Sequence, residues 1–381
     1  MSVAIYYNTA AMIQHRPPSP TSEEPGRIVG IEAVLKGSSI RSALQQLAKD
    51  PTVAPDIPVR LGSIWSSCRI VEVADPITDG EVAKEYGAKM VRNAEFKTPY
   101  TSPNVDPYCP DIYWAPGTWM AAKTAAAAAI VAAEATLSAK TLEHAFCIVR
   151  PPGHHCFSVP SGFCFLNNVV LAARVLLAAG KRVAILDWDY HFGDGTAHAL
   201  WDEENVMFVS LHAARTQSGH PTYPANTSRD MKGDGLRKRS KGRSFNVQWD
   251  VDDADDAAYA YAFRRLILPA VQQFAPDVIL VSAGYDAIRG DSLAGMELSV
   301  DAFGFMARAL TTLGKPIVAV LEGGYDVSLL AAGVASTILG LQQSPRFILF
   351  EEWMLQEPAA GHRETVDTVA RLVLNGPDLD V

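Results

Sequence analysis

The chain has 381 residues, a hydrophobic fraction of 48% and a formal net charge of -9 at pH 7. These values are typical of a soluble globular protein, and the negative charge argues against a general nucleic-acid binder, so we expect no direct nucleic-acid partner. One basic stretch, RKRSKGR at 237–243, is the exception, and we interpret it as a solvated loop.

Targeting signals and cysteines indicate where the protein resides. The first residues, MSVAIYYNTAAMIQHR, have no basic leader and no sustained apolar core, so we expect no signal peptide. The apolar run at 121–133 contains Lys123 and is too short for a bilayer, which predicts a buried helix and no membrane contact. Five cysteines without a CxxC pair favour reduced thiols in a cytoplasmic protein. Among them, Cys156 lies beside two histidines, and we interpret it as a buried thiol rather than a nucleophile.

Strand-like and helix-like segments alternate through the middle of the chain. Short apolar runs predict strands, and longer periodic runs predict helices that end at glycine. In chain order, the predictions are a strand at 144–149, a helix at 167–180, strands at 182–187 and 205–212, a helix at 255–275, a strand at 277–284, a helix at 299–314 and a strand at 316–324. Residues 16–26 and 97–117 are predicted loops. The alternation is typical of an α/β fold with a parallel sheet, and the absence of a dividing linker predicts one domain over 1–381.

Four predicted strands end in unusual polar motifs. These are RPPGHHC at 150–156, DWDYHFGDG at 187–195, SAGYDAIRGD at 282–291 and LEGGYD at 321–326. Because the carboxyl ends of parallel strands meet at one edge of a sheet, we expect these motifs to form one site.

Three side chains in these motifs are predicted ligands of one divalent metal ion. Asp187, Asp189 and His191 alternate after an apolar strand and therefore share one side of an extended chain. Asp189 and His191, together with Asp286 from the third motif, offer two carboxylates and an imidazole. This set leaves a coordination position open, which suits zinc or a related transition ion in a catalytic site.

The remaining two motifs offer proton-transfer and carbonyl-binding groups. Metal-assisted hydrolysis needs a base for water and an acid for the leaving amine, and the adjacent His154 and His155 are candidates for both. Tyr325 follows two glycines that let the backbone approach closely, so its phenol is a candidate donor to a carbonyl oxygen as negative charge develops there.

The motifs together resemble a known family. RPPGHH, GFCFLNN, ILDWDYHFGDGT, SLH, SAGYDAIRGD and LEGGYD occur in the order found in the zinc-dependent histone deacetylase and acetylpolyamine amidohydrolase superfamily. The resemblance, which runs from about Tyr6 to beyond Tyr325, includes bacterial histone deacetylase-like amidohydrolases. It implies the arginase-deacetylase fold, with a central, mostly parallel eight-stranded sheet flanked by helices. It also implies hydrolysis of the amide of an N-acetylated amine.

The same resemblance implies roles for individual residues. One zinc ion per chain is expected on Asp189, His191 and Asp286, with Tyr325 polarising the substrate carbonyl. The imidazoles of His154 and His155 are expected to bond Asp187 and Asp194, respectively, which fixes their tautomers. The walls of a narrow substrate tunnel are expected at Gly162, Phe163 and Tyr223. A structural potassium ion is expected at Asp187, Ser210 and the backbone carbonyls of Asp189, His191 and Leu211.

One residue departs from the family pattern. The family usually has a second histidine directly after the metal-binding one, and this chain has Phe192 there. Because that position is not a ligand in the family pattern, we expect zinc binding to survive and the hydrogen bonding behind the site to differ.

Alternative functions stay open. An arginase-like enzyme with two manganese ions needs bridging carboxylates, but the third motif offers Asp286 and then nothing until Asp291, which favours one metal. A non-catalytic binding module is expected to have lost a ligand, a histidine or the tyrosine, and all are present.

The substrate is a second open question. An acetylpolyamine, acetyl-lysine in a peptide and another small-molecule amide all present a carbonyl to the same metal. In this family the region at 93–119 contributes to the tunnel rim and to subunit contacts, so a homo-oligomer, a dimer or tetramer, is expected. Its acids Glu95, Asp106 and Asp111 are candidates to receive an amine.

Overall fold

Eight parallel strands form the centre of the protein. The computed structural model describes residues 1–17, 21–38, 64–97, 104–106, 109–224, 244–347 and 349–375. The strand order is β2-β1-β5-β10-β9-β6-β7-β8, and every adjacent pair is parallel. The eight-stranded sheet is therefore confirmed, and it is wholly rather than mostly parallel. The strands are β1 Ser2–Tyr7, β2 Arg69–Glu72, β5 Glu143–Ile148, β6 Val183–Asp187, β7 Val206–Ala213, β8 Phe245–Trp249, β9 Val278–Ala283 and β10 Ile317–Leu321.

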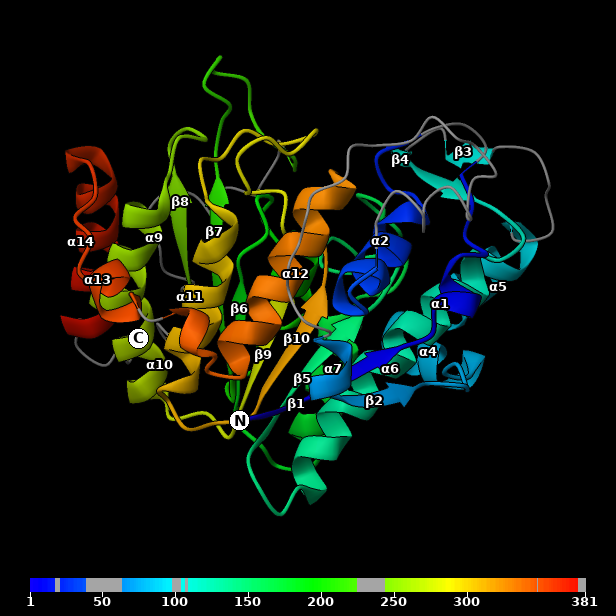
Figure 1. Ribbon diagram of the computed structural model, residues 1–381. Helices are drawn as coiled ribbons and strands as arrows, with labels where there is room; N and C mark the ends of the chain where they lie inside the picture. The colour runs from blue at the N-terminus through cyan, green and yellow to red at the C-terminus, as the bar shows by residue number, and fades with distance from the viewer. Residues whose placement is uncertain are drawn as a thin grey trace.

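Helices flank the sheet. In Figure 1, α2, α12 and α11 run in front of the strands, and α6 and α7 lie behind them. The helices are α1 Thr9–Met12, α2 Gly26–Leu35, α4 Asp79–Tyr86, α5 Ala88–Lys97, α6 Thr118–Ser138, α7 Asn168–Ala178, α8 Asp194–Ala199, α9 Asp256–Ala262, α10 Leu268–Phe274, α11 Val300–Thr311, α12 Val327–Leu341, α13 Phe350–Met354 and α14 Ala360–Asn375. The described residues form a single α/β domain, as predicted.

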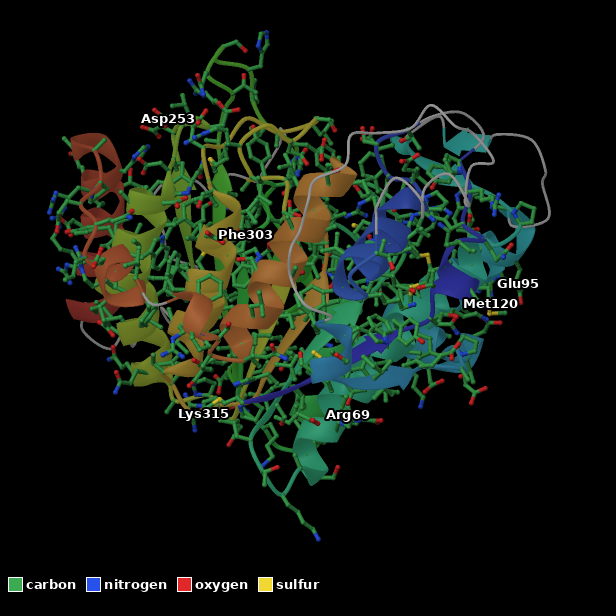
Figure 2. All side chains as sticks on the ribbon, in the orientation of Figure 1. Arg69, Glu95, Met120, Asp253, Phe303 and Lys315 are labelled. Carbon is green, nitrogen blue, oxygen red and sulfur yellow. The ribbon has the colours of Figure 1, made fainter. Side chains whose placement is uncertain are left out.

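Because all strands run in the same direction, the four polar motifs lie at one edge of the sheet. Arg69 begins β2 and Lys315 lies just before β10, and both lie in the lower half of the molecule in Figure 2. Asp253, which follows β8, lies at the upper edge. The carboxyl ends of the strands therefore point upward in this view, and the loops that follow them converge there.

Burial on both faces explains the apolar runs in the central strands. All residues of β6 are buried, and its last residue, Asp187, pairs in register with Ser210 of β7 and Ser282 of β9. A strand whose sheet is covered by helices on both faces has no solvent-facing side, so alternation between apolar and polar residues disappears. Polarity returns only at the strand end, where the site begins.

Helix ends follow the predicted signals. Ser299 Oγ accepts the Ala302 N–H at 3.3 Å and caps α11, and Gly180 and Gly314 adopt positive φ just after α7 and α11. The predicted helix at 255–275 differs in one respect, because a π-turn at Phe263–Ile267 separates α9 from α10. Pro269 lies just beyond this turn and has no N–H to donate, which accounts for the local widening.

Two other predicted segments are corrected. The strand predicted at 316–324 ends at Leu321, because the glycines after it turn the chain toward the site. The loop predicted at 97–117 contains a two-stranded antiparallel ribbon made of β3 Asn104–Asp106 and β4 Cys109–Trp114. The basic stretch at 237–243 lies outside the described residues.

The alanine-rich helix α6 is buried, as predicted. Its length and composition alone would allow it to cross a membrane, but 56% of its apolar window is buried inside the protein. It packs against α7 and β5. Small alanine side chains let the helix approach its neighbours closely, so its apolar character serves the core.

Candidate metal-dependent active site

The three predicted metal ligands lie together at the carboxyl edge of the sheet. Asp189 and His191 are in the turn after β6, and Asp286 is in the turn after β9. One ligand atom from each lies within 4.8 Å of the others. His191 Nδ1 is 3.0 Å from Asp286 Oδ2 and 3.2 Å from Asp189 Oδ1. The structure thus brings together two residues that are nearly adjacent in sequence and one that is far from them.

Backbone groups hold the two carboxylates in place. Asp189 Oδ2 accepts the Gly323 N–H at 2.8 Å, and Asp286 Oδ1 accepts the Tyr190 N–H at 2.9 Å. A Cβ at Gly323 would lie only 2.4 Å from Asp286 Oδ2 and 2.6 Å from Asp189 Oδ2, so this position requires glycine. The oxygens that remain are directed toward the imidazole.

The electrostatics of the carboxylate pair fit a divalent cation. Burial, followed by the charge of Asp189, raises the pKa of Asp286 to about 6. Two buried carboxylates this close repel each other, and a cation between them relieves the repulsion. Two oxygen donors and one nitrogen donor, all on buried turns, are a set that zinc binds in catalytic sites.

His154 and His155 adjoin the ligands and bond the predicted carboxylates. His154 Nδ1 lies 3.0 Å from Asp187 Oδ2, and His155 Nδ1 lies 2.7 Å from Asp194 Oδ1. The centroids of the two imidazole rings are 4.1 Å apart. In His155, which also lines the pocket, the bonded Nδ1 leaves Nε2 available to a substrate, whereas His154 Nε2 lies 3.8 Å from Asp189 Oδ1.

The two imidazoles have opposite pKa shifts. Burial would lower the pKa of His154, but the carboxylates of Asp189 and Asp187 outweigh it and hold this pKa well above its usual value. Burial, reinforced by the charge on His154, lowers the pKa of His155 to about 4. At neutral pH these shifts favour the charged form of His154 and the neutral form of His155.

The sequence prediction missed Glu322, which supports the histidine loop. This buried side chain follows β10, and its Oε2 accepts the Gly153 N–H at 2.6 Å and the His154 N–H at 3.1 Å. Burial raises its pKa to about 7. The available signal was an acid directly after an apolar strand, but its partners lie 169 and 168 positions away.

A pocket opens above the metal ligands. Its lining includes the predicted wall residues Gly162, Phe163 and Tyr223, together with the rim candidate Asp111. His155, His191 and Tyr325 also line it. The lining residues without a predicted role are Tyr190, Thr216, Thr222 and Leu293. Glu95, in contrast, is exposed on α5, and the side chain of Asp106 lies outside the described residues.

Aromatic rings narrow this pocket. The ring centroid of Phe163 lies 5.7 Å from that of Tyr325, and the centroid of Tyr223 lies 4.8 Å from that of His155. Gly162 and Phe163 both have positive φ, and a Cβ at Gly162 would lie 2.5 Å from His155 Cδ2. Only glycine lets the chain pass so close to this imidazole.

Phe192 fills the space behind the site where the family pattern has a histidine. Its buried ring packs against His212, with ring centroids 4.7 Å apart. His212 Nδ1 in turn lies 2.8 Å from Ser210 Oγ. An apolar ring therefore occupies this position, directly after the ligand His191, and the expectation that zinc binding survives stays a prediction.

The residues predicted to bind potassium adjoin one another on β6 and β7. Asp187 pairs in register with Ser210, and both are buried, as is Leu211. Asp187 Oδ1 accepts the Asp189 N–H at 3.1 Å, so this carboxylate also shapes the metal-binding turn. Potassium binding itself stays a prediction.

Cys156 is buried, as interpreted from the sequence. Its Sγ donates to the Phe165 carbonyl at 3.1 Å, and burial raises the pKa of the thiol. A buried thiol with a raised pKa is a poor nucleophile. The other described cysteines, Cys68, Cys147 and Cys164, are also free.

Comparisons with known proteins give one consistent result. Residues 71–341 match the family model of the histone deacetylase domain. The chain is 35% identical to histone deacetylase clr3 of Schizosaccharomyces pombe over 66% of this chain and 37% of that protein. It is 33% identical to histone deacetylase HDA1 of Candida albicans over 68% of this chain and 31% of that protein. The chain thus matches about a third of the length of these fungal relatives.

A solved structure shares the fold. The HDA15 HD domain superposes with a TM-score of 0.78 at 26% sequence identity, over 98% of this chain and 94% of that one. The matched family model and the shared fold agree. The chain belongs to the histone deacetylase domain family.

Proposed function

We propose that the protein is a zinc-dependent deacetylase that hydrolyses the amide of an N-acetylated primary amine. The observation that carries this proposal is that Asp189, His191 and Asp286 share a site with the His154–His155 pair and Tyr325. Ligands, proton carriers and a carbonyl donor are the three components that metal-assisted amide hydrolysis requires. The family membership supports the same reaction.

Zinc, when bound by Asp189, His191 and Asp286, supplies a Lewis acid that polarises the amide carbonyl and makes water more acidic. His155, neutral at pH 7, accepts a proton through Nε2 as water attacks the carbonyl carbon. The same nitrogen then returns the proton to the amine as the C–N bond breaks. The products are acetic acid and the amine, which at neutral pH become acetate and the alkylammonium ion as the acid passes its proton to the amine, and His155 ends in its starting form.

In this mechanism His154 and Tyr325 stabilise the developing negative charge and do not carry protons. The carboxylates of Asp189 and Asp187 raise the pKa of His154, and Asp187 stays bonded to its Nδ1 when Asp189 holds the ion, so we assign His154 a positive charge beside the developing negative charge. The hydroxyl of Tyr325 donates to the carbonyl oxygen as that oxygen becomes an anion. Burial raises the pKa of this phenol, which keeps its proton in place.

The pocket favours a substrate with a slender alkyl chain. Phe163, Tyr223 and Leu293 give it an apolar or aromatic lining. Asp111 is the one acid among the described lining residues outside the metal ligands, which suits a peptide amide or a single amine better than a polycation. We therefore infer that acetyl-lysine in a peptide is preferred over an acetylpolyamine.

Zinc stoichiometry and potassium belong to the same proposal. Among the described residues, one cluster has the geometry of a metal site, which supports one zinc ion per chain rather than an arginase-like pair of manganese ions. A potassium ion held by Asp187 and Ser210 would help to balance the charge of the buried carboxylate. Elemental analysis after dialysis against sodium and against potassium buffers tests both proposals.

A substrate panel tests the reaction and its preference. The zinc-loaded protein is assayed with acetyl-lysine peptides, acetylated polyamines and simple acetanilides, with kcat/KM measured from the free amine released. We expect the peptides to be hydrolysed most efficiently, and Asp286→Ala, which removes a ligand, to be inactive on all three. Equal turnover by Asp286→Ala would contradict the proposal, and a preference for acetylpolyamines would overturn the substrate assignment alone.

A further inference from the structure

The peptide unit between Gly324 and Tyr325 is held at both ends by buried charged side chains. Arg27 Nε donates to the Gly324 carbonyl at 2.7 Å. At the other end of the same peptide, the Tyr325 N–H donates to Asp291 Oδ2 at 2.7 Å. Both atoms belong to one planar group, so fixing them fixes the plane from which the Tyr325 side chain projects.

Asp291 makes more than this one bond. Its Oδ2 also accepts the Asp326 N–H at 3.0 Å, and its Oδ1 accepts the Leu293 N–H at 2.9 Å. The side chain is 8% exposed, so these bonds are largely shielded from water. One carboxylate thus joins the turn that carries Tyr325 to the loop that brings Leu293 to the pocket.

The loop of Asp291 is itself anchored. The Asp291 N–H donates to the Ile288 carbonyl at 3.0 Å, and the Arg289 N–H donates to the Leu298 carbonyl at 2.8 Å. A carboxylate on a fixed loop can define the position of a neighbouring turn. Gly324, in contrast, has φ of 112°, a conformation that leaves the turn few restraints of its own.

We propose that Asp291 is a positioning residue for Tyr325, which holds the phenol hydroxyl at the carbonyl-binding point of the pocket. Displacement of a reacting group by about 1 Å can cost about 100-fold in rate, so the orientation of this turn matters to catalysis. This inference rests on the proposed deacetylase function for its kinetic consequence, and the hydrogen bonds on which it stands do not depend on that function.

Asp291→Asn is the main test, because it keeps the shape while both carboxylate oxygens accept backbone N–H groups, so its amide must face either Leu293 or the Tyr325 and Asp326 pair. In the zinc-loaded enzyme we expect kcat to fall about 10- to 100-fold with KM changed less than about threefold. In a Tyr325→Phe background the same substitution should cost less than about threefold, because the hydroxyl it positions is gone. The same loss in both backgrounds would overturn the proposal.

Asp326→Asn is the matched control. Asp326 lies next to Tyr325, and its Oδ1 accepts the N–H groups of Ser328 and Leu329 at 2.9 Å each, as the N-cap of α12. Asparagine caps helices about as well as aspartate. This variant removes the same charge without releasing the Tyr325 amide, so we expect kcat close to that of the unmodified protein.

Hydrogen exchange provides a readout that needs neither metal nor substrate. In Asp291→Asn we expect the amides of Tyr325 and Asp326 to exchange about tenfold faster, with the rest of β10 and α12 unchanged. Asp291→Ser, whose shorter side chain withdraws both oxygens from the Tyr325 and Asp326 amides, is measured alongside and has the same expected result, which decides the case in which the asparagine oxygen stays on those amides. Unchanged exchange at Tyr325 would overturn the proposal. If the unmodified protein hydrolyses no acetylated amine, the proposed function fails while this measurement still decides the role of Asp291.

Discussion

At the scale of single residues, the hydroxyl of Tyr325 is the simplest group to remove. Tyr325→Phe keeps the ring that packs against Phe163 and removes only the proposed donor to the carbonyl oxygen. Loss of one such donor costs about 100- to 1,000-fold in kcat, and we expect that loss here with zinc content and Tm nearly unchanged. Single-turnover rates and elemental analysis check both parts. A variant with full turnover would remove Tyr325 from the mechanism.

The two histidines should contribute unequally to proton transfer. His155, whose pKa is lowered to about 4, is the neutral base, and His154, whose pKa is raised, is the fixed positive charge. His155→Ala should therefore depress kcat more than His154→Ala, with zinc retained in both. Loss of the base should also flatten the acidic limb of the kcat–pH profile. If His154→Ala alone lost that limb, the two roles would be reversed.

The sequence revealed the site residues that carry chemistry and missed those that hold them. Asp189, His191 and Tyr325 sit in short motifs whose residue types are uncommon after an apolar strand. Glu322 and Asp291 lie in the same motifs, but their importance depends on hydrogen bonds to backbone groups of other segments. A backbone donor has no sequence signature, so only the fold identifies its acceptor.

At the scale of secondary structure elements, His144 joins two strands through a bond that depends on pH. Its Nδ1 on β5 accepts the Ile317 N–H at the start of β10, at 3.2 Å. Burial lowers the pKa of His144 to about 4, below its ordinary value of 6.5. The unfolded chain therefore binds this proton first as pH falls, and stability is lost between pH 6.5 and 4, with a slope of up to about 1.4 kcal/mol per pH unit.

His144→Asn tests this dependence, because the amide oxygen can replace Nδ1 as acceptor and does not titrate. We expect stability similar to that of the unmodified protein at pH 7 and a shallower loss of stability between pH 6.5 and 4. Urea unfolding across this range measures the slope. A chelator in every sample serves as a control, because metal release at low pH would add its own slope. Identical slopes would show that His144 does not contribute.

The crossing of α11 and α12 depends on two glycines. A Cβ at Gly340 would lie 2.1 Å from the Gly304 carbonyl oxygen, which is backbone and cannot move aside alone. Gly340→Ala should therefore lower the free energy of unfolding by about 1–3 kcal/mol. Gly80→Ala on α4 is the matched control, because its Cβ would meet nothing closer than 3.7 Å. Alanine there should be neutral or stabilising by up to about 1 kcal/mol. If the two variants shifted the urea midpoint in the same direction, this explanation would be contradicted.

Strands that form a continuous apolar run between turn signals could be predicted from the sequence, and strands without that pattern could not. β6 and β9 are continuous apolar runs because both of their faces are covered. β2 has only four residues, none of them buried, so it carries no apolar run. β1 has as many residues as β9, but no turn signal precedes its apolar run, and such a run alone does not separate a strand from a buried helix. The sheet order, which places β1 between β2 and β5, depends on contacts that no local pattern encodes.

At the scale of the whole molecule, the metal site should contribute to stability as well as to catalysis. The ligands come from turns after β6 and β9, and Gly323 after β10 bonds one of them, so a cation there links three adjacent strands. Binding to the folded state alone stabilises by about 4 kcal/mol when free zinc exceeds Kd about 1,000-fold. Chelation should therefore lower the Tm of the unmodified protein.

Asp286→Ala separates this effect from a general response to the chelator. The variant lacks one ligand and also lacks the repulsion that Asp286 feels from Asp189, so it should fold without the ion. We expect the Tm of the variant to be the same with and without chelator, and its zinc content to be near zero. The Tm of the unmodified protein should fall by several degrees on chelation and return when zinc is restored. Calorimetry and elemental analysis on the same samples give both quantities. If Asp286→Ala kept one zinc per chain and the same Tm shift, the ion would be held elsewhere and the assignment of these three ligands would be wrong.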